Sequence, residues 1–119
     1  MANPNLLNVL TAYGKTEVFA ISTTPTMQCQ NPLASNKIYK INSIFVANVN
    51  GTSPASVTLS FNRNGVSTPI ASTVNIEQDS SLVALGKDTG LYLEEGDSLE
   101  FASTVDGYLT GVVSFEILG

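Results

Sequence analysis

The sequence predicts an all-β fold, an antiparallel two-sheet β-sandwich for which jelly-roll connections are the expected topology. The 119 residues are 43% hydrophobic and only 13% charged, which suits one packed domain of ordinary size. Turn signals recur about every ten residues, and apolar and polar residues alternate between them. The one short helix candidate, residues 6–13, is flanked by Asn, Pro and Gly, so we expect a helix content below about a tenth.

Eight short segments have the length and composition of strands. The stretch between the first and second segments, residues 24–36, contains Pro25 and Pro32, which predicts a loop or an irregular sheet edge because proline cannot donate to a strand ladder. The predicted strands are residues 16–23, 37–48, 56–62, 69–76, 81–85, 90–93, 98–104 and 109–118.

The longest predicted strand, residues 37–48, is apolar on both faces. Strict alternation places two sets of side chains on opposite faces: Tyr39, Ile41, Phe45 and Ala47 on one, and Lys40, Asn42, Ile44 and Val46 on the other. We therefore expect this strand to lie centrally and to be partly covered on both sides.

Turn dipeptides separate several of these strands. Asn64-Gly65 is the strongest hairpin signal, because both residues tolerate the positive φ of a type I′ turn. The other turn dipeptides are Asn50-Gly51, Gly96-Asp97 and Asp106-Gly107. Alternation between the turns predicts a core of large apolar side chains, with Phe45 also on a core-facing phase. The predicted core residues are Leu59, Phe61, Leu99, Phe101, Val113 and Phe115.

The first residues of the chain carry apolar side chains without turn signals that would fold them back. We divide the chain into an N-terminal arm, residues 1–14, and a β-sandwich domain, residues 15–119. An apolar arm is a liability in a solitary monomer, so we expect it to contact a partner protein. The candidate partner-binding residues are Leu6, Leu7, Val9, Leu10 and Tyr13.

The composition argues against an enzyme and against a cofactor. The chain has no His, which excludes Ser–His–Asp and Cys–His catalysis and any zinc site built on imidazole. The single cysteine, Cys29, has no His to act as its base and is expected to be a small packing residue.

Acidic residues gather at one turn, around Gly96. Glu94, Glu95, Asp97 and Glu100 form this cluster. The tip of a hairpin is an exposed position, so we expect a solvated turn in preference to a calcium site or a catalytic carboxylate pair.

Neither nucleic acid nor a membrane is an expected partner. The net charge is −5 and the five basic residues are scattered, so counterion release offers no gain in nucleic-acid binding. No stretch approaches the roughly 20 apolar residues of a membrane span, and the first residues do not form a secretory signal.

Four segments of the chain are distinctive when taken together. They are residues 1–5 (Met-Ala-Asn-Pro-Asn), 13–16 (Tyr-Gly-Lys-Thr), 38–48 (Ile-Tyr-Lys-Ile-Asn-Ser-Ile-Phe-Val-Ala-Asn) and 91–99 (Leu-Tyr-Leu-Glu-Glu-Gly-Asp-Ser-Leu). Together they resemble a known family, small virion structural proteins of tailed bacteriophages, cyanophages included. The strand–turn–strand pattern that ends in Glu-Gly-Asp recurs in several phage head and tail proteins.

This resemblance implies a structural role in the virion, after assembly in the host cytoplasm, and no catalytic residues. The implied position is capsid decoration (cement), in which the chain forms a homotrimer and binds and stabilises the shell of the major capsid protein. A tail, neck or fibre-base protein that contacts another virion protein is the first alternative. A carbohydrate-binding module at the virion surface is the second, and the absence of Trp argues against it.

Overall fold

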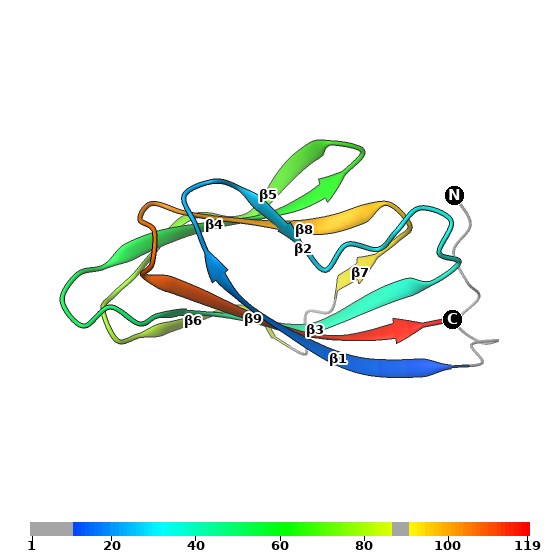
Figure 1. Cartoon of the computed structure of the whole chain (residues 1–119), viewed down its shortest axis with the longest axis horizontal. Helices are drawn as coiled ribbons and strands as arrows, with labels where there is room; N and C mark the ends of the chain where they lie inside the picture. The colour runs from blue at the N-terminus through cyan, green and yellow to red at the C-terminus, as the bar shows by residue number, and fades with distance from the viewer. Residues whose placement is uncertain (1–10, 87–90) are drawn as a thin grey trace.

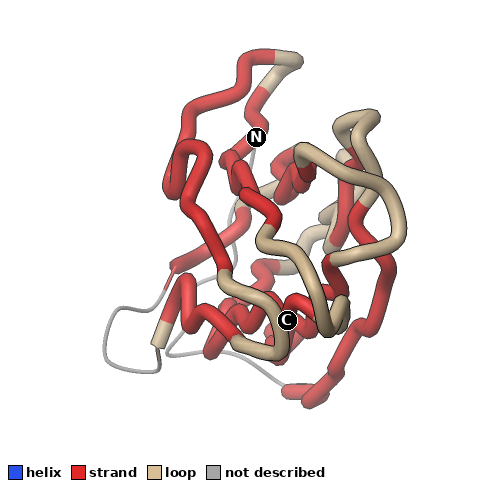
Figure 2. The backbone as a smooth tube through the Cα atoms, turned by 90° about the vertical axis from the view of Figure 1, so that its left-hand side faces the viewer, coloured by secondary structure: helices blue, strands red, loops and turns tan. Residues whose placement is uncertain are grey.

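A computed structural model describes residues 11–86 and 91–119 and shows a β-sandwich (Figure 1). None of the described residues is in a helix and 66% are in strands, which agrees with the low helix content expected. The tube in Figure 2 is accordingly strand and loop throughout its described length. The strands are β1 (Ala12–Ile21), β2 (Thr26–Gln28), β3 (Ile38–Asn48), β4 (Ala55–Arg63), β5 (Val66–Ile76), β6 (Ser81–Leu85), β7 (Leu91–Leu93), β8 (Asp97–Ser103) and β9 (Leu109–Leu118).

The strands form two antiparallel sheets, which lie as two layers in Figure 1. Sheet A has the order β1-β9-β3-β6, and β7 also pairs with β3 beyond the end of β6. Sheet B has the order β2-β8-β4-β5. The predicted two-sheet antiparallel sandwich is therefore confirmed, whereas the jelly-roll connection pattern stays a prediction.

The core lies between the two sheets and is built from both. Of the six predicted core residues, five are at most 3% exposed, and Phe61 is half-buried and packs against them. Two aromatic pairs contribute. Phe19 of sheet A meets Phe101 of sheet B edge to face at 4.7 Å, and Tyr39 stacks on Phe115 at 5.5 Å.

Local signals placed several elements correctly. The predicted strands 81–85 and 109–118 have the bounds of β6 and β9. Asn64 and Gly65 connect β4 to β5 with φ values of 55° and 80°, as the predicted type I′ turn requires. The start of the predicted strand 90–93 lies outside the described residues at Gly90, and its remainder is β7.

Two predictions at the beginning of the chain need correction. The first strand begins at Ala12 rather than at residue 16, so residues 12–14 pair with β9 instead of belonging to the arm. The number of strands is nine among the described residues in place of the expected eight, because residues 24–36, predicted as a loop or an irregular sheet edge, contain the short edge strand β2, which pairs with β8. Three residues of β2 are too few to give a readable alternation, which explains the omission.

The predicted faces of residues 37–48 were also wrong. Ile41, Ile44 and Val46 all lie in the core, whereas Phe45 is 42% exposed on the opposite face of sheet A. The reason is a β-bulge. Asn42 has no partner on β9, because Ile41 lies opposite Phe115 and the next paired residue, Ser43, lies opposite Ser114. One extra residue reverses the alternation for the remainder of the strand.

Candidate protein-binding surface

Four apolar side chains form a row across the outer face of sheet A, the face turned away from sheet B. We call Val18, Val112, Phe45 and Val83 the apolar row. Its members lie directly opposite one another in the pairs β1–β9, β9–β3 and β3–β6, so neighbouring side chains lie on one face of the sheet. Val18 is 74% exposed and Val83 56%, whereas Val112 is partly covered between its neighbours.

The residues on both sides of the apolar row are small and uncharged. On one side lie Ala20, Thr110, Ala47 and Ser81, which are opposite one another in the same strand pairs. On the other side lie Thr16, Ser114 and Ser43. A surface with an apolar centre and uncharged flanks loses little solvation when a protein covers it, because no ion has to be desolvated. This face is the part of the described molecule that best fits protein binding.

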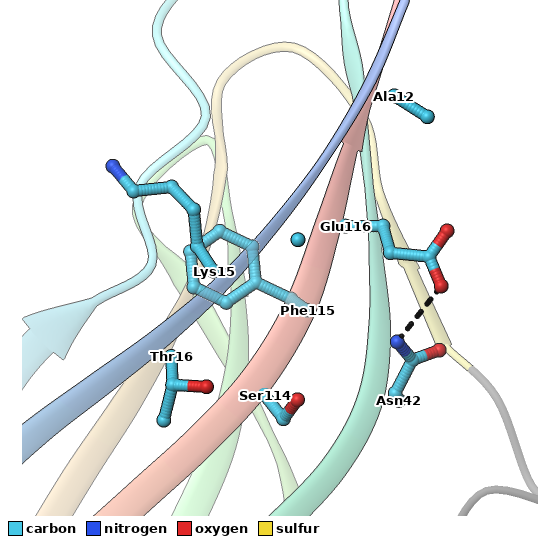
Figure 3. A pocket seen from close by; sticks show the side chains of 8 residues that line it. Ala12, Lys15, Thr16, Asn42, Ser114, Phe115 and Glu116 are labelled. Carbon is cyan, nitrogen blue, oxygen red and sulfur yellow. Dashed lines mark hydrogen bonds between the residues drawn. The ribbon is translucent and has the colours of Figure 1, made fainter.

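A shallow hollow adjoins this face where β1 begins (Figure 3). It has a volume of about 390 Å³, and its lining residues come from the first half of β1, the second half of β9 and the bulge in β3. Asn42, the bulged residue, donates a hydrogen bond from its side chain to Oε1 of Glu116 at 3.1 Å. Glu116 also lies opposite Lys40, so the charged groups on this face are found at the end bearing the hollow, away from the apolar row.

Of the candidate partner-binding residues from the sequence, the structure describes Tyr13. It lies in β1 opposite Ile117 and is 59% exposed. The other four, Leu6, Leu7, Val9 and Leu10, lie outside the described residues. The apolar row was not found from the sequence. Its four members are far apart along the chain, and only the strand order brings them together.

The acidic turn differs from its prediction. Glu95 and Asp97 are buried, and Asp97 is only 1% exposed. The guanidinium of Arg63 donates to both carboxylate oxygens of Asp97, at 2.9 and 2.7 Å, and also forms an ion pair with Glu94. The backbone N–H of Asn36 donates to Oε2 of Glu95 at 2.8 Å. The turn is therefore an ordered ion-pair network.

The carboxylates of the turn already have partners within the protein, so few of their oxygens remain to bind a cation. Hydrogen bonding to Asp97 raises the pKa of Arg63, which keeps the guanidinium charged. The strand register could have indicated the pair, because Arg63 lies directly opposite Asp97 in the β4–β8 pair. Among residues 11–86 and 91–119, no three His, Cys, Asp or Glu side chains are grouped so that they could hold a metal ion.

Cys29 lies in the core with its thiol near a carboxylate. Its side chain is 3% exposed, and both its backbone N–H and its Sγ–H donate to Oε2 of Glu17, at 3.0 and 2.9 Å. Burial raises the pKa of the thiol, and the hydrogen bond and charge of Glu17 raise it further. A neutral, enclosed thiol is a packing residue and a poor nucleophile.

The fold and this surface define a small β-sandwich with one sheet face that is uncharged over the apolar row and the rows beside it. In the described part of the chain no helix is long and apolar enough to cross a membrane.

Comparison with known proteins supports the fold. No protein-family model and no curated protein matches the chain. It is similar to the structure described as "Bacillus endospore appendages form a novel family of disulfide-linked pili", with 19% identity, a TM-score of 0.53 and coverage of 91% of this chain and 85% of that one. Another solved structure, the nucleoplasmin-like N-terminal domain of Drosophila FKBP39, has 13% identity and a TM-score of 0.45, over 89% of each chain. At such identities the likeness to the Bacillus protein concerns the sandwich fold alone.

Proposed function

We propose that the chain is a structural protein of a tailed-phage virion, and that it acts as a capsid decoration (cement) protein on the shell of the major capsid protein. One structural observation supports the proposal: nothing among the described residues covers the apolar row or the uncharged rows on both sides of it. The resemblance of four sequence segments to virion proteins supplies the biological setting. A protein that binds only the assembled shell stabilises it by mass action, which requires a contact surface and no catalytic group.

The size of the apolar row limits what it can do by itself. A fully buried Val or Phe side chain contributes about 1.5–3 kcal/mol, and these side chains are already partly covered in the free protein. Stable protein interfaces bury roughly 800 Å² on each partner, so the flanking small residues have to join the contact. Several copies on one shell add their contacts, which suits a repetitive partner such as a capsid.

The test compares binding to purified phage capsids that lack this protein. The double substitution Val18→Ser with Val83→Ser should weaken binding at least about tenfold, because it makes both ends of the apolar row polar. The control is Val66→Ser with Ile70→Ser, which changes two exposed apolar residues of β5 in sheet B. Equal capsid affinity of the two variants would count against sheet A as the contact face.

A homotrimer is part of this proposal and rests on the sequence resemblance to virion proteins alone. Light scattering at high protein concentration should give three times the mass of the 12.5 kDa chain. A monomer at every concentration would contradict the trimer, and the proposed contact with the shell would not depend on that result.

A tail, neck or fibre-base position is the alternative within the same class, since the Glu-Gly-Asp pattern of residues 95–97 occurs in head and tail proteins alike. Cryo-electron microscopy of intact particles separates the two positions directly.

The Bacillus appendage protein is described as disulfide-linked, and that linkage has no counterpart here because the single cysteine, Cys29, is buried.

A carbohydrate-binding module is the second alternative. It is favoured by Tyr92 of β7, which is 44% exposed and can offer a ring to a sugar. Titration of sugars followed by tyrosine fluorescence tests it, with Tyr92→Ala as the matched variant. An unchanged spectrum across the sugars tested would remove this alternative.

A further inference from the structure

We propose that residues 6–10 of a second copy of this chain pack on the apolar row, so that copies associate by exchanging their N-terminal segments. The proposal rests on the proposed function in one respect, that the outer face of sheet A binds protein. It differs in the occupant of the apolar row, because a row covered by residues 6–10 of a second copy is not free to contact the shell, and the experiments below distinguish the two. Among residues 11–86 and 91–119, nothing covers the row: Val18, Phe45 and Val83 are all more than 40% exposed.

The first argument is chemical. Residues 1–10 contain no Asp, Glu, Lys or Arg, and four of the five residues 6–10 are Leu or Val. The face that would receive them is uncharged over the apolar row and the rows on both sides of it. An uncharged apolar segment and an uncharged apolar face can be buried together without desolvating an ion.

The second argument is the reach of the segment, which limits what residues 6–10 of the same copy can cover. The described chain begins at Thr11, and Val18 lies seven residues further along, a distance of about 23 Å along an extended strand. The other members of the apolar row lie beside Val18 across the sheet, at the same level. Leu6 is five residues before Thr11, so its Cα lies at most about 18 Å from that of Thr11 even if the chain turns straight back, and only the end of its side chain could touch Val18. Leu7, Val9 and Leu10 reach less far.

The residues that could reach the row within one copy are unsuited to it. Of residues 1–10, only residues 1–4 are far enough from Thr11, and Met1 is the one large apolar side chain among these four. The limit on reach disappears when the segment comes from another copy, whose Thr11 can lie anywhere near the face.

Self-association without phage particles provides the test. Deletion of residues 2–10 leaves β1 intact and should raise the dissociation constant for self-association at least about tenfold in sedimentation velocity. Val18→Ser with Val83→Ser should have a similar effect in the full-length chain. The double substitution should raise the dissociation constant of the truncated chain only slightly further, since the deletion and the substitution remove the same contact. Val66→Ser with Ile70→Ser should leave association unchanged, and circular dichroism of each variant confirms the fold.

Cross-linking locates the contact. Leu7→p-benzoylphenylalanine in one copy, irradiated in a mixture with a second copy of different mass, should attach to the other copy at peptides containing Val18 or Val112. Cross-links within one copy, cross-links to sheet B, or undiminished association of the truncated chain would each overturn the proposal. If Val18→Ser with Val83→Ser abolishes capsid binding while the truncated chain associates normally, the face binds the shell directly. The proposed function then stands and the segment exchange fails.

Discussion

Gly111 of β9 lies directly opposite Phe19 of β1, and the Phe19 ring occupies the space that a side chain at position 111 would need. A Cβ at Gly111 would lie 2.5 Å from Cε2 of Phe19. The ring cannot move easily, because its other contact is the edge-to-face packing on Phe101 of the opposite sheet. The absence of a side chain at position 111 therefore helps to set how the two sheets meet.

Gly111→Ala should destabilise the protein by about 1–3 kcal/mol, the usual cost of overpacking a core. Urea denaturation measures the change. Gly14→Ala in β1 is the matched control, since a Cβ there would meet no atom within 4 Å. Equal stability of the two variants would show that Phe19 can move aside without cost.

Phe115→Ala should lower the free energy of unfolding by about 3–5 kcal/mol, because the side chain is 3% exposed and stacks on Tyr39. Phe45→Ala should cost much less, since Phe45 lies on the outer face of sheet A. Thermal denaturation of both variants checks this difference. If Phe45→Ala were as damaging as Phe115→Ala, the bulge at Asn42 would not reverse the strand's faces.

Arg63→Met should destabilise the fold by about 1–3 kcal/mol, because it leaves the buried Asp97 carboxylate without its charged donor. Arg63→Lys should destabilise the fold by less than Arg63→Met, since an ammonium keeps the positive charge but cannot form the bidentate hydrogen bonds to Asp97. Lys15→Met, at an exposed position of β1, is the control for loss of a positive charge. The network at the acidic turn would be dispensable if the two methionine variants unfolded at the same urea concentration.

The Cys29 thiol should react with iodoacetamide at pH 8 at least about a hundredfold more slowly in the folded protein than in urea. The sign follows from the raised pKa. At pH 8 the folded protein holds the protonated thiol, and only the thiolate reacts. Mass spectrometry of the alkylated chain follows the rate. Equal rates in the folded and unfolded protein would mean that the thiol is accessible.

Local features were predictable from the sequence because their causes are local. Asn64-Gly65 forms its hairpin through its own backbone preferences, and the strands β6 and β9 follow from alternation between turn residues. The same reasoning placed Leu59, Leu99, Phe101, Val113 and Phe115 in the core. The fold class thus depended on signals that each span only a few residues.

What the sequence determined by itself was where most strands and turns lie, β2 and the start of β1 excepted, and that the molecule is an antiparallel sandwich. The tertiary structure decided which strands are neighbours, and this placed Val18, Phe45, Val83 and Val112 in one row although they come from four strands. It also buried Asp97 against Arg63, 34 residues away, and turned Phe45 outward through a bulge formed against β9. Each of these features is set by pairing between distant strands. Alternation along one strand gives its two faces but does not specify which residue lies opposite.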